Sequence, residues 1–536
     1  MANLRILPLE TPTLGDRSYL VHDGEVAFVV DPQRDIDRVV DLAGREQVRI
    51  THVFETHIHN DYVTGGLALA ELTGAAYFVN AADDVSYDRT PVCDGEVGFV
   101  VDPQRDIDRV LELAAREQVH ITHVFETHIH NDYVTGGLAL ARKTGAAYFV
   151  NGADEVAYDR TPIADGDEVQ VSPSLRMKAI ATPGHTFTHL SYALTSNGEP
   201  VAVFTGGSLL FGATGRPDLL GHEHTHDLVH AQYHSAQRLA GELPDATEVL
   251  PTHGFGSFCS ATQSDATDST IGQEKQNNPV LTSSEQDYVD ALLAGLDVYP
   301  AYYVHMAPAN SAGPTEPDLS LPAQAEPAEL RRRIEAGEWV VDLRTRTAFA
   351  AGHVPGSLNF GLDGGFATYL GWLIEWGTPL TLLGETEADV AKAQRELVRI
   401  GIDRPAAAAT GSPQDWTDQP LASFPRATFA DLDQVRHHRD VVILDVRRTA
   451  EFTTARIEGA LNIPLHELPT RVHEVPDAEV WVHCAGGYRA SVAASFLSAA
   501  NKKLVAIDDT FDNAKATGLH LVTDEPANAE KVEEDR

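Results

Sequence analysis

The chain has 536 residues and a formal net charge of −39, with 79 acidic against 40 basic side chains. That charge argues against nonspecific binding to nucleic acid or to anionic membranes, because both are negatively charged. No apolar run approaches the roughly 20 residues of a membrane span, and only three cysteines occur, far apart, which favours a reducing compartment. We therefore expect a cytoplasmic protein of three or four domains.

A block of sequence is repeated in tandem near the N-terminus. Residues 23–93 align without gaps on residues 94–164, and the copies differ at only about a dozen of 71 positions. Each copy alternates strand and helix patterns, which is typical of an α/β architecture. In copy one the expected order is strand 25–32, helix 34–47, strand 49–56, a histidine loop, helix 65–74 and strand 75–80.

Half of a sheet is expected on each side of the repeat. Strand patterns at 4–10 and 18–24 precede copy one only, whereas the strand-rich segment 167–185 follows copy two only. We therefore predict that one copy completes the domain and that the other is supernumerary. Copy two is favoured slightly, because it runs directly into the segment that contains His185.

Proline, alanine and serine become dense in two stretches, which we interpret as linkers. Two units of similar layout follow the first linker, and each contains a buried strand that ends in Asp-x-Arg. The predicted organisation is a first domain at 1–305, a linker at 306–328, a second domain at 329–405, a linker at 406–426, a third domain at 427–523 and an acidic tail at 524–536.

Histidines spaced as metal ligands occur in both copies of the repeat. The strand ITHVFET leads into a His-x-His pair, and alternate residues of an extended segment point the same way, so the pair can converge on one ion. An acid two residues later can be a further ligand or a group that supports the ligands. The candidates are His57, His59 and Asp61 in copy one, and His128, His130 and Asp132 in copy two.

Two further histidines occur once each. His185 follows a Pro-Gly turn in ATPGHTFTHLSY, and His253 follows an apolar strand in VLPTHGFGS. Each stands just past a strand, so with one His-x-His pair they can line one edge of a sheet sandwich. Because His185 and His253 each occur only once, we expect the repeat to contain two copies of the ligands of a single site. Three more histidines at 222–227 (HEHTHD) are interpreted as surface residues of a polar loop without a catalytic role, and adventitious metal binding is the alternative.

The segments THIHND, TPGHT and PTHG resemble the metallo-β-lactamase superfamily, over about residues 1–305. The resemblance is strongest to the glyoxalase II and persulfide dioxygenase branch, particularly to members fused to rhodanese domains. It implies an αββα sandwich with a metal between the strand-end loops. Two positions depart from the family pattern: Tyr62 or Tyr133 replaces a histidine, and Gly207 replaces an acidic ligand.

These departures change the expected metal site. A binuclear zinc hydrolase is disfavoured, because the second metal position loses a histidine and the bridging carboxylate together. A three-histidine set remains, which can hold one divalent ion, Fe(II) or Zn(II), with open positions. Asp218 is either a substitute carboxylate or a turn residue, and a metal-free pseudo-site is the alternative.

The segment AEVWVHCAGGYRASVAASFL predicts a nucleophilic cysteine. A strand ends at Cys484, the glycines let backbone N–H groups face the sulfur, and a helix N-terminus with Arg489 favours the thiolate. The pattern Cys-x-x-Gly-x-Arg, with Gly487, resembles the rhodanese active-site loop over about 427–523. Asp445, Arg447 and Glu451 match the other rhodanese signature, whereas Ala455-Arg456 replaces the usual Gly-His.

The unit at 329–405 also resembles a rhodanese, through DLRTRTAFAAGHVPGSLNF. Gly-Glu-Thr-Glu at 384–387 stands where the cysteine loop should begin, so this copy lacks a thiol nucleophile. We expect it to serve structure, substrate guidance or dimerisation. The fold prediction is thus a multidomain α/β chain: an αββα metallo-β-lactamase sandwich followed by two α/β rhodanese domains.

The leading functional hypothesis joins the two parts through sulfur. A persulfide dioxygenase-like metal domain would act on a low-molecular-weight thiol persulfide, and a rhodanese would transfer sulfur through Cys484, with a thiosulfate-like donor as the other substrate class. The alternatives are a glyoxalase II-like thioester hydrolase and a non-catalytic sulfur carrier. Neither nucleic acid nor membrane is an expected partner, and homo-oligomerisation is left open.

Overall fold

The computed structural model describes residues 4–11, 16–30, 33–54, 65–79, 90–91, 96–254, 258–260 and 266–523. The chain divides into two compact units. The first comprises residues 1–318 with 395–403, and the second comprises residues 319–394 with 404–536. No helix in the described part combines the length and the apolar character that crossing a bilayer requires.

Copy one of the repeat pairs with the N-terminal strands. Together they form a six-stranded sheet in the order β1-β2-β3-β4-β5-β6, in which β1 and β2 are antiparallel and the strands of copy one are parallel. The elements are β1 (Arg5–Thr11), β2 (Asp16–His22), β3 (Val26–Val30), α1 (Asp37–Glu46), β4 (Arg49–Phe54), α2 (Gly66–Thr73), β5 (Ala76–Val79) and β6 (Thr90–Pro91).

Copy two forms a separate, fully parallel sheet in the order β10-β9-β8-β7. Its elements are β7 (Glu96–Val101), α3 (Asp108–Arg116), β8 (Val119–Phe125), α4 (Gly137–Thr144), β9 (Ala147–Asn151) and β10 (Thr161–Ile163). Helix α1 buries only Val39 and Ala43, whereas its near-identical counterpart α3 buries seven of nine residues. The difference arises because α3 also packs against β4 and β5 of copy one.

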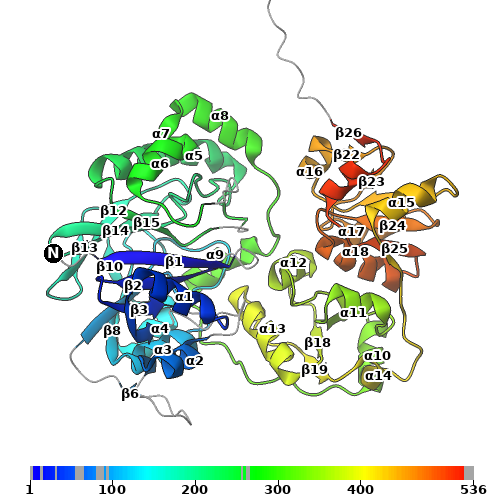
Figure 1. The fold of residues 1–536 in the computed structure, drawn as a ribbon, viewed down its shortest axis with the longest axis horizontal. Helices are drawn as coiled ribbons and strands as arrows, with labels where there is room; N and C mark the ends of the chain where they lie inside the picture. Colours follow the sequence, from blue (N-terminus) through cyan, green and yellow to red (C-terminus); the bar gives the residue numbers. More distant parts are fainter. Residues whose placement is uncertain are drawn as a thin grey trace, which may run out of the picture. The chain divides into compact units, whose positions relative to one another are not determined.

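The sandwich is built from copy two and the segment that follows it. A second sheet, β11-β12-β13-β14-β15, shares a core with copy two through Phe125, Phe149, Met177 and Tyr192. Helices α5 to α8 cover the other face of this sheet, while α3 and α4 cover copy two (Figure 1). The added elements are β11 (Glu168–Gln170), β12 (Leu175–Ala181), β13 (Leu190–Ser196), β14 (Glu199–Gly206), α5 (His222–Glu242), β15 (Glu248–Pro251), α6 (Ile271–Asn277), α7 (Pro279–Thr282) and α8 (Glu285–Gly295).

The second unit contains two further parallel sheets, in the orders β17-β16-β18-β19 and β20-β25-β24-β21-β23. The first has α10 (Pro327–Glu335), β16 (Trp339–Asp342), α11 (Arg346–Ala351), β17 (Leu358–Asn359), α12 (Phe366–Leu373), β18 (Leu380–Gly384), α13 (Glu387–Arg399), β19 (Ala407–Thr410) and α14 (Pro413–Trp416). The second has β20 (Arg426–Ala427), α15 (Phe429–Arg436), β21 (Val442–Asp445), α16 (Thr449–Thr454), β23 (Leu461–Asn462), β24 (Val480–His483), α18 (Tyr488–Ala499) and β25 (Leu504–Ile507). The fold class is thus α/β throughout.

Three segments differ from the sequence-based expectation. The predicted polar loop at 222–227 is wrong, because α5 begins at His222 and gains its stability from an apolar face further along, including Leu228, Val229 and Leu239. Helix α9 (Tyr303–Ala312) extends into the stretch interpreted as the first linker. Strand β19 and helix α14 lie within the second, since alanine-rich β19 is a buried sheet strand.

Candidate functional site

The histidine loop of copy two is held by a buried acid. Asp102 directly follows β7, and its Oδ1 and Oδ2 accept hydrogen bonds from the backbone N and the Oγ1 of Thr127, each 2.7 Å long. Oδ2 also accepts a hydrogen bond, 2.5 Å long, from Thr252 Oγ1, which follows β15. One carboxylate therefore ties the ends of strands from both sheets together.

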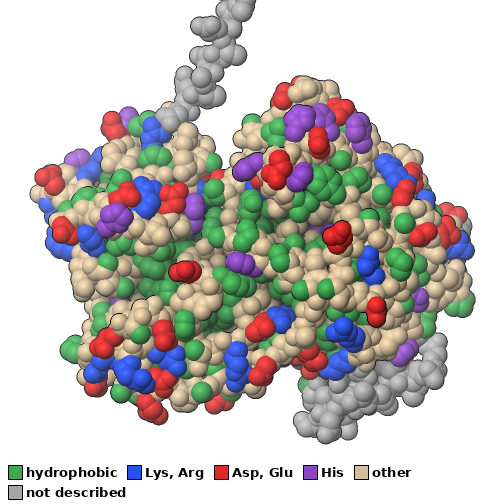
Figure 2. Space-filling model, turned by 180° about the vertical axis from the view of Figure 1, so that it is seen from behind, with side chains coloured by type: hydrophobic (Ala, Val, Ile, Leu, Met, Phe, Trp, Pro, Cys, Tyr) green, Lys and Arg blue, Asp and Glu red, His purple; other side chains and the backbone are tan. Residues whose placement is uncertain are grey.

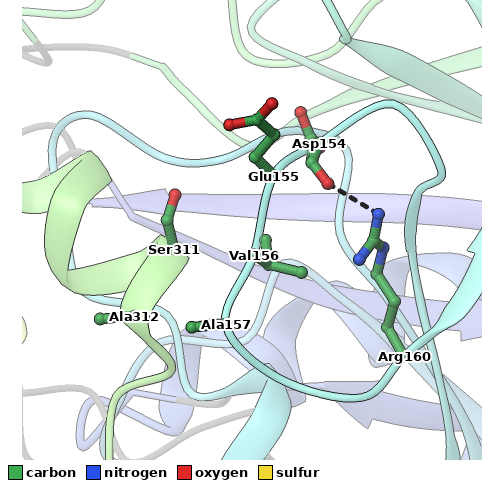
Figure 3. A pocket seen from close by; sticks show the side chains of 7 residues that line it. All are labelled: Asp154, Glu155, Val156, Ala157, Arg160, Ser311 and Ala312. Atoms are coloured by element: carbon green, nitrogen blue, oxygen red, sulfur yellow. Dashed lines mark hydrogen bonds between the residues drawn. The ribbon is translucent and has the colours of Figure 1, made fainter.

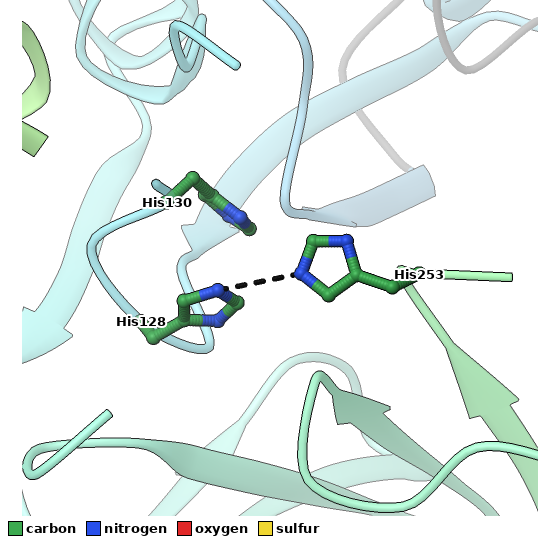
Figure 4. A group of neighbouring side chains, drawn as sticks. All are labelled: His128, His130 and His253. Atoms are coloured by element: carbon green, nitrogen blue, oxygen red, sulfur yellow. Dashed lines mark hydrogen bonds between the residues drawn. The ribbon is translucent and has the colours of Figure 1, made fainter. Parts of the chain in front are cut away.

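Four histidines that the sequence pattern selected converge at this edge of the sandwich, and none is more than 3% exposed. The ring centroids of His128 and His130 lie 4.2 Å apart, and that of His185 lies 4.9 Å from His128 and 5.2 Å from His253. Nε2 of His128 lies 3.5 Å from Nε2 of His253 (Figure 4). The structure therefore brings together the residues that the sequence pattern selected in copy two.

Two ring nitrogens in the cluster have no hydrogen-bond partner among the described residues: Nδ1 of His130 and Nε2 of His185. His185 Nδ1 donates instead to the carbonyl of Arg216, at 2.9 Å, which leaves a lone pair on Nε2. Burial lowers the pKa of His185 to about 3 and holds the pKa of His128 well below its usual range. Neutral imidazoles with free lone pairs are metal ligands, so the cluster fits one divalent ion.

Carboxylates surround the opposite side of His130. Its Nε2 lies 3.3 Å from Asp102, 3.2 Å from Glu126 and 3.0 Å from the hydroxyl of Tyr133. Burial opposes a charge on this ring, but the two acids outweigh burial and raise the pKa of His130 to about 10. Three oxygens surround Nε2 and none is bonded to Nδ1, so a metal that displaces the Nδ1 proton would leave the remaining proton on Nε2.

Asp132 forms a second acid–base pair with His253. Its Oδ2 lies 3.2 Å from Nδ1 of His253. Burial opposes the carboxylate charge, but His253 outweighs burial and holds the pKa of Asp132 below its usual range. The other carboxylate oxygen, Oδ1, has no hydrogen-bond partner among the described residues.

The two departures from the family pattern have structural consequences. Tyr133 donates to the carbonyl of Asp102 and contacts His130, as an element of the wall around the cluster. A Cβ atom at Gly207 would lie 2.3 Å from the ring of His185, so no aspartate fits there without displacing that ligand. Asp218 forms two hydrogen bonds of 2.7 Å with Arg216 and is therefore not a substitute carboxylate.

Two buried residues of this site escaped the sequence analysis. The sulfur of Cys259 lies within 4.8 Å of a ring nitrogen of both His185 and His253. His189 donates from Nδ1 to Thr182, and its Nε2 accepts from the backbone N of Gly207 at 3.1 Å. The short spacing in HGFGSFC and in HTFTH was the only available signal for either residue. The copy-one candidates His57, His59 and Asp61 lie outside the described residues.

The cysteine loop lies at the end of β24, where Cys484 is only 2% exposed. The backbone N of Gly487 donates a hydrogen bond of 3.1 Å to its sulfur. Gly487 has φ +93°, and a Cβ atom there would lie 2.5 Å from Asp508 Oδ1, so glycine is required on both counts. Helix α18 starts at the next residue, so its N-terminus faces the loop that contains the sulfur of Cys484.

Arg489 is held beside this loop by two hydrogen bonds to Glu451, of 2.6 Å and 2.8 Å. Burial opposes the charge on Glu451, but Arg489 and Arg448 outweigh burial and lower the pKa of Glu451 to about 2. Asp445 and Arg447 form a buried ion pair at the end of β21, and Arg447 also donates to the carbonyl of Ala455. These contacts stabilise the turn that leads from β21 into α16.

The thiol-free rhodanese-like domain contributes to the surroundings of Cys484. Ser491 of α18 donates to Asn359 at 2.9 Å, and Tyr488 donates to the carbonyl of Gly361 at 3.0 Å. A small cavity beside Arg489 is lined from both domains, by Tyr369, Trp372, Leu373, Val446, Arg448, Leu465, His466 and Arg489. The two domains therefore line one cavity beside Arg489, on the first turn of the helix that follows Cys484.

A larger hollow lies elsewhere in the first unit, between the loop at 154–160 and the end of α9 (Figure 3). Arg160 donates to the backbone carbonyl of Asp154 at 2.7 Å, and Ser311 and Ala312 form the other wall. The lining contains neither histidine nor cysteine, so we assign it no chemistry.

Comparison with known proteins agrees with this architecture. The metallo-beta-lactamase superfamily model matches residues 14–99, and the rhodanese-like domain model matches residues 326–419 and 428–516. The chain belongs to the metallo-β-lactamase superfamily and carries two rhodanese-like domains behind that domain.

The relatives lie in the glyoxalase II branch. A hydroxyacylglutathione hydrolase of Pseudomonas entomophila (strain L48) is 30% identical over 210 residues, which cover 35% of this chain and 77% of that protein. Another, of Polaromonas sp. (strain JS666 / ATCC BAA-500), is 31% identical over 160 residues, 29% of this chain and 57% of its own length. A crystal structure of a metallo-beta-lactamase from Staphylococcus aureus subsp. aureus COL has a TM-score of 0.51 at 23% identity, covering 76% of this chain and 99% of that chain, which shows the fold alone. At family level these matches support sulfur-related or hydrolytic chemistry.

Proposed function

We propose that this chain is a sulfur-metabolism enzyme that combines a single-metal reaction on a low-molecular-weight thiol persulfide with sulfur transfer through Cys484. The observation that carries the proposal is the cradle of Cys484, in which a backbone N–H group contacts the sulfur at a helix N-terminus. Such a cradle stabilises negative charge on sulfur.

In the transfer reaction the Cys484 thiolate attacks the outer sulfur of a persulfide or thiosulfate-like donor. The donor S–S bond breaks, and the donor leaves with the bonding electron pair as a thiolate or as sulfite. An acceptor such as cyanide or sulfite then takes the sulfur from the Cys484 persulfide and restores the thiolate. Gly487 and the first turn of α18 hold the negative charge in both states.

In the metal domain, His128, His130 and His185 would hold one divalent ion. When bound, iron(II) or zinc(II) supplies open coordination positions and Lewis acidity. Asp102 and Glu126 keep the proton on Nε2 of His130. Asp132 and His253 form an acid–base pair that can accept the proton of the persulfide substrate. With iron, the overall reaction converts persulfide, dioxygen and water into thiol and sulfite.

The transferase half is tested by thiosulfate:cyanide sulfur transfer. Cys484→Ser abolishes thiocyanate formation in this account, because serine cannot carry a sulfane sulfur. Cys259→Ser is the matched control, since its sulfur lies in the other unit. Thiocyanate formation by the Cys484→Ser protein at the wild-type rate would disprove the assignment.

A glyoxalase II-like thioester hydrolase is the second candidate, favoured by the names of the relatives. Zinc-dependent cleavage of a glutathione thioester would establish it. Tyr133 and Gly207 count against it, because they remove a histidine and a carboxylate of a binuclear centre. Metal analysis separates both enzymes from a pure sulfur carrier, for which less than about a tenth of an equivalent of iron or zinc is expected.

A further inference from the structure

Helix α5 carries a row of histidines that takes no part in the buried cluster. His222, His226, His230 and His234 follow one another at four-residue spacing, so they share one face of the helix. His226 and His234 are exposed and His230 is half-buried, whereas the opposite face packs into the core. Histidine side chains gather beside carboxylates on this side of the molecule (Figure 2).

A carboxylate from a neighbouring helix faces this row. Glu285 begins α8, and its Oε1 lies 2.6 Å from Nδ1 of His230 and 3.2 Å from Nε2 of His234. The ring centroid of His226 lies 4.7 Å from that of His230. Val229 and Ala236 of α5 pack in one core with Tyr288 and Val289 of α8, so the spacing of the two helices is set by buried contacts.

The arrangement has the chemistry of a metal site. Two imidazoles reach the same carboxylate oxygen. Their ligand atoms are not all within 4.8 Å of one another, so the exposed ring of His234 turns inward when one divalent ion binds both rings and the carboxylate. Paired histidines at i and i+4 of a helix are an established zinc-binding geometry. Imidazole with carboxylate suits zinc, copper and nickel rather than magnesium or calcium. The hydrogen bond from His230 also lowers the pKa of Glu285, which keeps this carboxylate charged at neutral pH.

We propose that His226, His230, His234 and Glu285 form a surface site for a divalent ion of the zinc and copper class, separate from the buried histidine cluster. A simple ion pair requires one histidine per carboxylate. Here a second ring nitrogen contacts the same oxygen, and a third ring lies in contact with the first. The site does not depend on the proposed sulfur chemistry.

The test is a zinc titration of the full-length, metal-stripped protein, followed by calorimetry. The double variant His230→Ala/His234→Ala binds one equivalent less than wild type, while His185→Ala loses a different equivalent and retains this one. His520→Ala is the matched control, because His520 is an exposed histidine whose Nδ1 lies 3.2 Å from a single glutamate, Glu458. It loses no equivalent.

A milder variant and a second probe keep the result independent of folding. Glu285→Gln preserves the shape of the side chain and weakens zinc binding at least about tenfold by removing the charge. Copper(II) bound to the His185→Ala protein, in which the buried site is removed, shows coupling to imidazole nitrogens in its paramagnetic resonance spectrum, and adding His230→Ala and His234→Ala removes that signal. An unchanged zinc stoichiometry in the double variant, or an unchanged copper spectrum, would overturn the proposal.

Discussion

Gly487→Ala tests whether the cradle of Cys484 acts through this one backbone group. The left-handed backbone at φ +93° costs an alanine about 1–2 kcal/mol, and the new Cβ atom meets Asp508 Oδ1 at 2.5 Å. Relief of these contacts moves the backbone N away from the sulfur, 3.1 Å distant. A hydrogen bond to a charged group contributes about 1.5–3 kcal/mol. We therefore expect kcat/KM for thiosulfate:cyanide transfer to fall about ten- to hundredfold.

Two glycines of the same domain provide matched controls. A Cβ atom at Gly486 meets nothing within 4 Å, so Gly486→Ala alters the loop composition without the clash. Gly459 has φ +78° in open space, so Gly459→Ala imposes the backbone penalty away from the sulfur. Both controls retain transfer activity, and Gly459→Ala shares the loss of stability in urea. A folded Gly487→Ala protein as active as Gly486→Ala would refute the reasoning.

Further predictions concern both centres. His185→Ala removes the bound metal equivalent of the buried cluster, measured by elemental analysis after dialysis, and an unchanged metal content would contradict the ligand assignment. Gly207→Asp, although it restores the family residue, creates no second metal site and destabilises the domain by about 1–3 kcal/mol in urea, because its Cβ atom displaces the ring of His185. Glu451→Gln lowers the urea midpoint at pH 7. Glu451 has a pKa of about 2 in the folded protein, below its ordinary value. The stability that its charge contributes is therefore fully present above about pH 4.5 and is lost as the pH falls toward 2. The difference in urea midpoint between the variant and wild type accordingly narrows below pH 4.5. A difference independent of pH would show that the ion pair with Arg489 is not its cause.

Residues that act near their own strand end could be predicted from the sequence. His128, His130 and Cys484 each follow a buried strand, and parallel strands of one sheet deliver such residues to a common edge. Repeated patterns such as Asp342-x-Arg344 and Asp445-x-Arg447 indicated two related α/β domains before any contact was known. Local sequence therefore sufficed for the fold class and for the centre of each site.

Contacts between distant segments could not be predicted in the same way. The two copies are nearly identical, so only packing distinguishes α1 from α3, and the one sequence signal for copy two in the sandwich was its direct continuation into the segment with His185. Cys259 reaches the histidine cluster through a loop whose path no periodicity records. Helix α5 was missed at its start because six polar residues precede the first clear apolar positions of its buried face.

Oxygen consumption by the iron-loaded protein with a thiol persulfide tests the central claim most directly. We predict dioxygen uptake, with about one molecule of sulfite formed per molecule of dioxygen, as the balanced reaction requires. Sulfite that has accepted a sulfur atom from the Cys484 persulfide is counted with the free sulfite. Cys484→Ser retains the uptake but loses sulfur transfer, whereas His185→Ala loses the uptake and retains the transfer. Absence of dioxygen uptake by the wild-type protein containing a full equivalent of iron would contradict the account.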